Sequence, residues 1–121
     1  MSELAEADFG DWENLPLSEI ETKWPVEYAG YLELADGFRF PGGESLAGFT
    51  ARIDKAAESI LFKNGDGCAA VVSHGGVMRR LIMSMVERDC PTWNELHISP
   101  CGFAVIEKVN GKRALSAQGW V

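Results

Sequence analysis

The sequence predicts an α/β fold in which helices alternate with strands and the chain ends in an antiparallel hairpin. The uninterrupted apolar run Cys68–Val72 predicts a strand buried on both of its faces. The dipeptide at 110–111, Asn-Gly, separates strand-like residues 103–109 from 112–117 and is a strong hairpin signal. These strands make a thin sheet, so we expect most of an α/β domain with some strands missing.

The first third of the chain predicts loops around one short helix. Ser18, with Glu21 three residues later, forms a capping-box pattern. It predicts a helix from about Glu19 that ends before Pro25, because the residue preceding a proline disfavours helix. Residues 25–43 show no clear period, so we expect a loop there with one helical turn around Glu27–Leu34.

Two longer helices flank the apolar run. Apolar side chains at helical spacing predict a helix over residues 45–62, capped by Ser45 and ended by the Asn-Gly-Asp-Gly sequence at 64–67. A further helix is predicted over residues 76–86. Its buried face is expected to consist of Val77, Leu81, Ile82 and Met85.

Length and composition exclude several classes of protein. With 121 residues, 46% of them hydrophobic, the chain makes at most one domain with an ample core. Its formal net charge of −7 argues against nucleic-acid binding, so any phosphate site must be a local pocket. No apolar run is long enough to span a bilayer, and the acidic N-terminus does not resemble a signal peptide.

The cysteines suggest a reducing compartment. Cys68, Cys90 and Cys101 are odd in number and widely spaced, which does not predict a disulfide framework or a zinc site. We therefore expect a cytoplasmic protein that uses neither a metal nor a cofactor.

His74 is the first candidate for chemistry. It follows the apolar run, and Gly75 and Gly76 open the next helix. Ligands in open α/β sheets bind at the carboxyl ends of strands, and amides at a helix N-terminus attract anions. Locally, the pattern fits a phosphate site and a hydrogen-bonded histidine in a capped turn equally well.

Other polar residues are weaker candidates. Glu6, in a glycine-containing loop, could serve as a general acid, although the local pattern favours a solvated surface carboxylate. Arg52 could reach an anion, but we expect it to extend along its helix surface. Arg79 and Arg80 are expected to form structural ion pairs, with substrate contact as the alternative. His97 is expected to be a surface or turn residue.

Three blocks in order are more specific than any single residue. They are LAEADFGDWE at 4–13, PGGES at 41–45 with Phe49 and Arg52 after it, and VVSHGGVMRRL at 71–81. Together they resemble the histidine phosphatase superfamily, also called the phosphoglycerate mutase-like family. The resemblance implies a three-layer α/β/α fold, present here as a single partial domain over residues 1–121. Within the family, the residues of these blocks most resemble the branch of α-ribazole-phosphate phosphatases and broad-specificity phosphomonoesterases.

The resemblance also implies a mechanism through a phosphohistidine. A nucleophilic histidine takes the phosphoryl group, an acid protonates the leaving oxygen, and water releases phosphate. Glu6 falls on the family's acid/base carboxylate and His74 on its second active-site histidine. The Gly75 amide falls where the family donates a hydrogen bond to phosphate. The implied ligand is phosphate or a small phosphomonoester, and the natural substrate is left open.

The chain departs from the family pattern at one essential point. The family opens with a central strand ending in Arg-His-Gly, whose histidine is the nucleophile, and no such tripeptide occurs here. We therefore expect little or no phosphatase turnover by this chain alone, unless another polypeptide supplies the nucleophile. The alternative is a non-catalytic remnant that binds phosphate or dimerises. An unpaired strand edge at Cys68–Val72 further predicts a homodimer or a domain-swapped oligomer.

Overall fold

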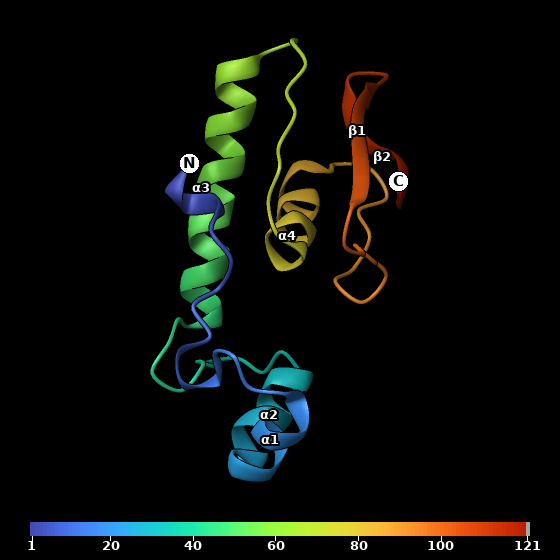
Figure 1. Ribbon diagram of the computed structural model, residues 1–121. Coiled ribbons are helices and arrows are strands. Elements are labelled where there is room, and N and C mark those ends of the chain that lie inside the picture. Colours follow the sequence, from blue (N-terminus) through green and yellow to red (C-terminus); the bar gives the residue numbers. More distant parts are fainter. Residues whose placement is uncertain (121) are drawn as a thin grey trace. The chain divides into compact units, whose positions relative to one another are not determined.

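The computed structural model describes residues 1–120 and contains two compact units (Figure 1). We call residues 7–51 the aromatic unit, and residues 1–6 with the chain from residue 52 onward the hairpin unit. The mixture of helices and strands confirms the α/β class. The elements in chain order are 3-10 turns at Ser2–Leu4 and Gly10–Trp12, helices α1 (Leu17–Lys23), α2 (Pro25–Leu32), α3 (Leu46–Asn64) and α4 (Gly75–Met85), and strands β1 (Gly102–Val109) and β2 (Lys112–Trp120).

A cluster of aromatic rings forms the core of the aromatic unit. Trp12 is almost fully buried at its centre. Its ring centroid lies 5.5 Å from that of Phe40 and 5.8 Å from that of Tyr31, both edge-on. Such edge-to-face pairs are favourable because the ring edge is positive and the face negative. The remaining rings around Trp12 belong to Trp24, Tyr28 and Phe38.

The first two sequence blocks meet inside this unit because two glycines let their backbones approach closely. The Asp11 amide donates to the Pro41 carbonyl oxygen at 2.7 Å. Gly10 has φ +55°, and a Cβ built on it would lie 2.2 Å from the Pro41 oxygen. A Cβ on Gly43 would lie 2.3 Å from the Asp8 oxygen. Both positions therefore require glycine, which gives these motif residues a structural role.

The short helices differ from the predicted ones. Helix α1 begins at Leu17 after Pro16, without a side-chain cap, so the predicted capping box at Ser18 is wrong. The helical turn predicted around Glu27–Leu34 is confirmed and forms a full helix, α2, over Pro25–Leu32 with Pro25 at its first position. Proline suits that position because its fixed φ is helical and its missing N–H has no helical partner.

The predicted long helices and hairpin are confirmed. Helices α3 and α4 match within one or two residues, and the Gly48 amide donates to the capping Ser45 hydroxyl at 3.0 Å. The four predicted apolar side chains of α4 are all buried. Asn110 and Gly111 both have positive φ, 52° and 79°, as a type I′ turn requires. No helix among the described residues is long and apolar enough to cross a membrane.

Helix α4 packs against the hairpin to form the core of the hairpin unit. Ile82, Val86 and Leu96 are buried there. Side chains packed against them come from α4, from the connection before β1, and from both strands: Met83, Ile98, Ala104, Ile106 and Leu115. The described sheet contains only β1 and β2, which agrees with the predicted incomplete fold.

The predicted buried strand at Cys68–Val72 is wrong. These residues run as an irregular connection between α3 and α4, and Val72 is 95% exposed. None of the backbone hydrogen bonds among the described residues joins 68–72 to another segment. A strand needs a neighbour to form a ladder, and the described chain supplies none for this run. The prediction of a single partial domain over residues 1–121 stays a prediction.

Candidate active site

His74 stands at the start of α4, as the sequence predicted. It occupies the position before the first helical residue, with extended backbone angles (φ −104°, ψ 161°), and its side chain is exposed. Its side chain makes no capping hydrogen bond to the helix. The imidazole is therefore available to a ligand beside the unpaired amides of the first helical turn.

Glu6 lies against the same helix end. A Cβ built on Gly76 would be 3.0 Å from Glu6 Oε1 and 3.6 Å from Oε2, so the carboxylate rests over this glycine. A negative group is favourable there because the helix dipole and the free amides make an N-terminus locally positive. The structure thus brings together the predicted acid and histidine, from positions far apart in sequence.

Two side chains fasten the segment that carries Glu6. The Arg52 guanidinium donates to the carbonyl oxygens of Glu3, Ala5 and Glu6 at 2.6, 2.7 and 3.1 Å. The Ser73 hydroxyl donates to the Leu4 carbonyl oxygen at 2.7 Å. These hydrogen bonds hold residues 3–6, here called the acid segment, to α3 and to the turn that carries His74.

Sequence reasoning missed this role of Arg52. The prediction that its side chain extends along the helix surface is wrong, since a guanidinium that satisfies three carbonyl oxygens organises a loop. The sequence signal for this role was the position of Arg52 shortly after the PGGES block at 41–45. Ser73, adjacent to His74, offered no comparable signal, because a short hydroxyl in a turn has many ordinary uses.

A cavity of about 680 Å³ joins these groups to the start of β1. Glu6, Ser73, His74 and Gly75 line one part of it, and residues 98–104 line another. A Cβ on Gly75 would lie 3.7 Å from the Ile98 oxygen, an ordinary contact. Among the described residues that line the cavity there is no lysine or arginine. The described lining of this cavity therefore offers an anion few positive partners besides the helix amides and the His74 imidazole.

The remaining candidates lie outside this cluster. Arg80 donates to both carboxylate oxygens of Asp54, which confirms its predicted structural ion pair. Arg79 instead stacks over Trp93, 5.4 Å from the ring centroid. His97 is exposed, as expected, and its Nδ1 lies 3.3 Å from the Glu95 carbonyl oxygen.

Comparison with known proteins identifies the family. A family model described as the histidine phosphatase superfamily (branch 1) matches residues 1–120. Phosphoserine phosphatase 1 of Hydrogenobacter thermophilus is 25% identical over 103 residues, which cover 85% of this chain and 49% of that protein. The solved structure of Bacillus stearothermophilus YhfR matches with a TM-score of 0.78 at 23% identity, over 100% of this chain and 60% of YhfR. The chain spans about half the length of the curated relative it matches. It belongs to the histidine phosphatase superfamily.

Proposed function

We propose that this chain provides the acid and phosphate-stabilising half of a histidine phosphatase site, which acts on a small phosphomonoester. The observation that carries the proposal is the position of the Glu6 carboxylate over Gly76, at the end of α4 where His74 stands. Family membership supports phosphoryl transfer as the reaction class.

Each residue of this half-site has a distinct chemical role in the proposal. His74 donates a hydrogen bond to the phosphoryl oxygens and, as an imidazolium, offsets charge that develops on them. Glu6 in its protonated form gives its proton to the leaving oxygen. The Gly75 amide, free of a helical partner, donates to a phosphate oxygen.

The nucleophile must come from elsewhere. The sequence contains two histidines, and His97 does not line the cavity that contains His74. Without a second histidine at the site, the phosphoryl group has no acceptor that could form a phosphohistidine. We therefore propose that residues 1–121 alone bind phosphate weakly and do not turn over substrate.

Phosphoserine is the first substrate to test. A phosphatase for that compound is named among the relatives, and a small phosphomonoester suits a cavity of this size. The α-ribazole phosphatase-like branch stays a prediction, so α-ribazole phosphate belongs in the same panel.

A turnover assay tests the proposal. The purified chain is incubated with p-nitrophenyl phosphate, phosphoserine and α-ribazole phosphate, with His74→Ala and the distant His97→Ala as a matched pair of variants. We expect no hydrolysis above background by any of the three proteins. Robust hydrolysis that His74→Ala abolishes and His97→Ala spares would show that the chain needs no nucleophile from outside, and would contradict the proposal.

A further inference from the structure

The negative charge of the chain is concentrated in the aromatic unit. Residues 7–51 contain nine acidic and two basic side chains, which gives a formal charge of −7. The hairpin unit contains nine side chains of each sign and is neutral. The aromatic unit therefore carries the whole net charge of the chain, and a surface of one sign attracts basic partners and repels acidic ones.

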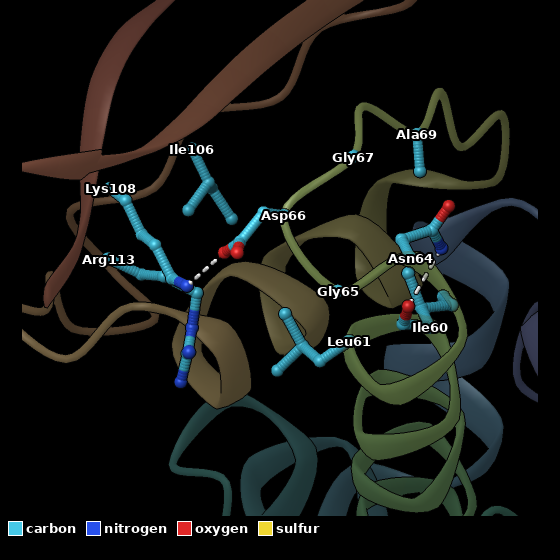
Figure 2. A pocket seen from close by; sticks show the side chains of 10 residues that line it. All are labelled: Ile60, Leu61, Asn64, Gly65, Asp66, Gly67, Ala69, Ile106, Lys108 and Arg113. Carbon is cyan, nitrogen blue, oxygen red and sulfur yellow. Dashed lines mark hydrogen bonds and ion pairs between the residues drawn. The ribbon is translucent and has the colours of Figure 1, made fainter. Parts of the chain in front are cut away.

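The basic side chains of the aromatic unit do not cancel this charge. Lys23 pairs with Glu19 one helical turn away, and the Arg39 guanidinium donates to a backbone carbonyl oxygen at 2.9 Å. In the hairpin unit, by contrast, acids and bases are balanced, and Figure 2 shows one such pair, Lys108 with Asp66 at 2.7 Å. Two cations cannot neutralise nine carboxylates, so the aromatic unit keeps most of its negative charge.

Helix α2 of this unit has apolar side chains on more than its inner face. Tyr28 and Tyr31 lie on the inner face, with ring centroids 6.3 and 5.8 Å from that of Trp12. Another face consists of four exposed residues, here called the α2 stripe: Pro25, Val26, Ala29 and Leu32. Their spacing places them along one side of the helix. Val26 is 79% and Leu32 63% exposed, so the stripe is an apolar surface without a described partner.

The neighbours of the α2 stripe are acidic. Glu27 lies within α2 and Glu33 directly follows it, and both side chains are exposed. Neither carboxylate forms an ion pair with another described residue. Helix α2 itself contains no basic residue. A partner that covers the stripe is therefore stabilised by basic side chains beside its own apolar ones.

The backbone of α2 restricts the shape of the partner. The Tyr28 amide donates to the Trp24 carbonyl oxygen at 2.8 Å, and the Glu33 amide donates to the Ala29 carbonyl oxygen at 3.2 Å. Because these groups are already paired, a strand would find no ladder to join, and only side chains are available for contact. Two helices pack through side chains in this way, with the ridges of one in the grooves of the other.

We propose that the α2 stripe docks an amphipathic helix of a partner protein. The apolar side chains of that helix cover Val26, Ala29 and Leu32, and its flanking lysines or arginines lie near Glu27 and Glu33. The eight residues of α2 span roughly 12 Å, so the contact is small, and its binding is weak and sensitive to salt. The cavity that contains His74 is lined by other residues, so this inference does not depend on the proposed phosphate chemistry.

Charge disfavours the other occupants of this surface. A second copy of the chain would bring another aromatic unit of formal charge −7 against the first, and like charges across an interface are unfavourable. Anionic lipid surfaces and nucleic acids are repelled for the same reason. A basic helix is attracted by the charge and covers the apolar stripe as well.

A designed peptide tests the surface with the complete 121-residue chain. The peptide is a helix of about 18 residues with leucines at i, i+4 and i+7 spacing, lysines beside them and alanines elsewhere. One control peptide has glutamate in place of every lysine. A second control has the same composition in an order that removes the leucine stripe. Fluorescence anisotropy measures the affinity, and ¹⁵N NMR shifts locate the contact.

We expect the lysine peptide to bind with a Kd in about the micromolar range at low salt, and both control peptides to bind at least about tenfold more weakly. The largest shifts should fall at residues 25–33. Added salt should weaken the binding, because it screens the attraction between the lysines and the carboxylates.

Matched variants separate the apolar contact from general adhesion. Leu32→Ser should weaken binding about three- to tenfold, because an apolar contact with the peptide is lost. Phe62→Ser removes an apolar side chain that is 89% exposed on α3, and it should leave binding unchanged. Both side chains are exposed, so neither substitution disturbs the folded core.

A second pair of variants tests the charge. Glu27→Gln combined with Glu33→Gln should weaken binding about three- to tenfold at low salt, and by less at high salt. Glu58→Gln combined with Glu107→Gln removes two exposed carboxylates from the hairpin unit and is the control. It should change the affinity much less, because these carboxylates do not adjoin the α2 stripe in sequence or belong to its unit.

Several results would overturn the proposal. They are no binding of the lysine peptide, equal binding of the glutamate peptide, shifts that are largest outside α2, or equal effects of a variant and its control. Concentration-dependent shifts at α2 without peptide would identify a second copy as the occupant. Binding to phosphatidylserine vesicles that Leu32→Ser abolishes would identify a membrane instead. Either of these results would also overturn the proposal.

Discussion

Glu6 places a negative charge where the amides of α4 would otherwise meet a phosphate. The groups compete for the same helix end, because the carboxylate already lies over Gly76. A charge at about 5 Å in a partly exposed site opposes an anion by about 1 kcal/mol or somewhat more. We therefore expect the Glu6 carboxylate to limit the affinity of the isolated chain for phosphate.

Replacing that acid should improve phosphate binding. We expect Glu6→Gln to strengthen the binding of inorganic phosphate about three- to tenfold, because the amide keeps the shape and removes the charge. An NMR titration measures the affinity. Glu58→Gln, on the exposed surface of α3, removes the same charge elsewhere and is the control. Weaker binding by Glu6→Gln than by the control would show that the carboxylate helps to hold the anion.

Arg52 should matter for the order of the acid segment. We expect Arg52→Met to lower the free energy of unfolding by about 1–3 kcal/mol, since three hydrogen bonds from a charged donor are lost while the aliphatic stem is kept. Chemical denaturation measures the loss. Hydrogen exchange should also quicken at residues 3–6, a local effect that general destabilisation does not predict.

The control for Arg52 is another arginine with few contacts. Arg88→Met removes a mostly exposed side chain whose ion pair, within the described part of the chain, is with its neighbour Asp89 at 3.6 Å. It should change stability by less than about 0.5 kcal/mol. Equal effects of the two substitutions would refute the tethering role of Arg52.

At the scale of elements, an ion-pair cluster joins α3 to α4. Arg80 donates to Asp54 through two nitrogens, and the Ser84 hydroxyl donates to the same carboxylate. The hydrogen bonds from Arg80 are the main reason that the pKa of Asp54 lies below its usual value of 3.8. A carboxyl whose pKa is lowered by folding stabilises the fold above its unfolded pKa, and this contribution is lost as pH falls through the folded value.

The pH dependence of stability tests this cluster. We expect Asp54→Asn to cost about 0.5–1 kcal/mol at pH 7, a modest figure because both side chains are partly exposed. The difference from the wild type should shrink as pH falls from about 5 to below 3.8, when the wild-type carboxyl becomes protonated as well. Denaturation at pH 7 and pH 3 measures both values. A difference independent of pH would exclude the charge as its source.

Helix α4 and the hairpin bury their side chains against each other, and both could be predicted from the sequence. The strand predicted at Cys68–Val72 could not form, because the described residues contain no neighbouring strand for it. Helix α4 packs its apolar stripe on the hairpin, so periodicity located both the helix and its buried residues. The Cys68–Val72 run has the composition of a central strand, but composition does not supply the adjacent strand. Glu6 and His74 nevertheless lie at the same helix end, because α4 and the hydrogen bonds from Arg52 and Ser73 position them without a ladder at 68–72.

For the whole molecule, the exposed apolar side chains of Val72, Phe103 and Val105 predict self-association of the isolated chain. The predicted homodimer or swapped oligomer thus remains our expectation for the isolated chain. Val72→Asp should shift the chain towards monomer in size-exclusion chromatography with light scattering. Val26→Asp, on α2 and 79% exposed, should not. A wild-type chain that stays monomeric at micromolar concentration would contradict this expectation.

The central claim is that the end of α4 is one half of a phosphate site. A ¹⁵N NMR titration of the chain with inorganic phosphate tests it most directly, with His74→Ala alongside. We predict weak, saturable shifts that are largest at the Gly75 and Gly76 amides and are lost or strongly reduced in His74→Ala. Shifts scattered over the surface, or unchanged by the substitution, would contradict the claim.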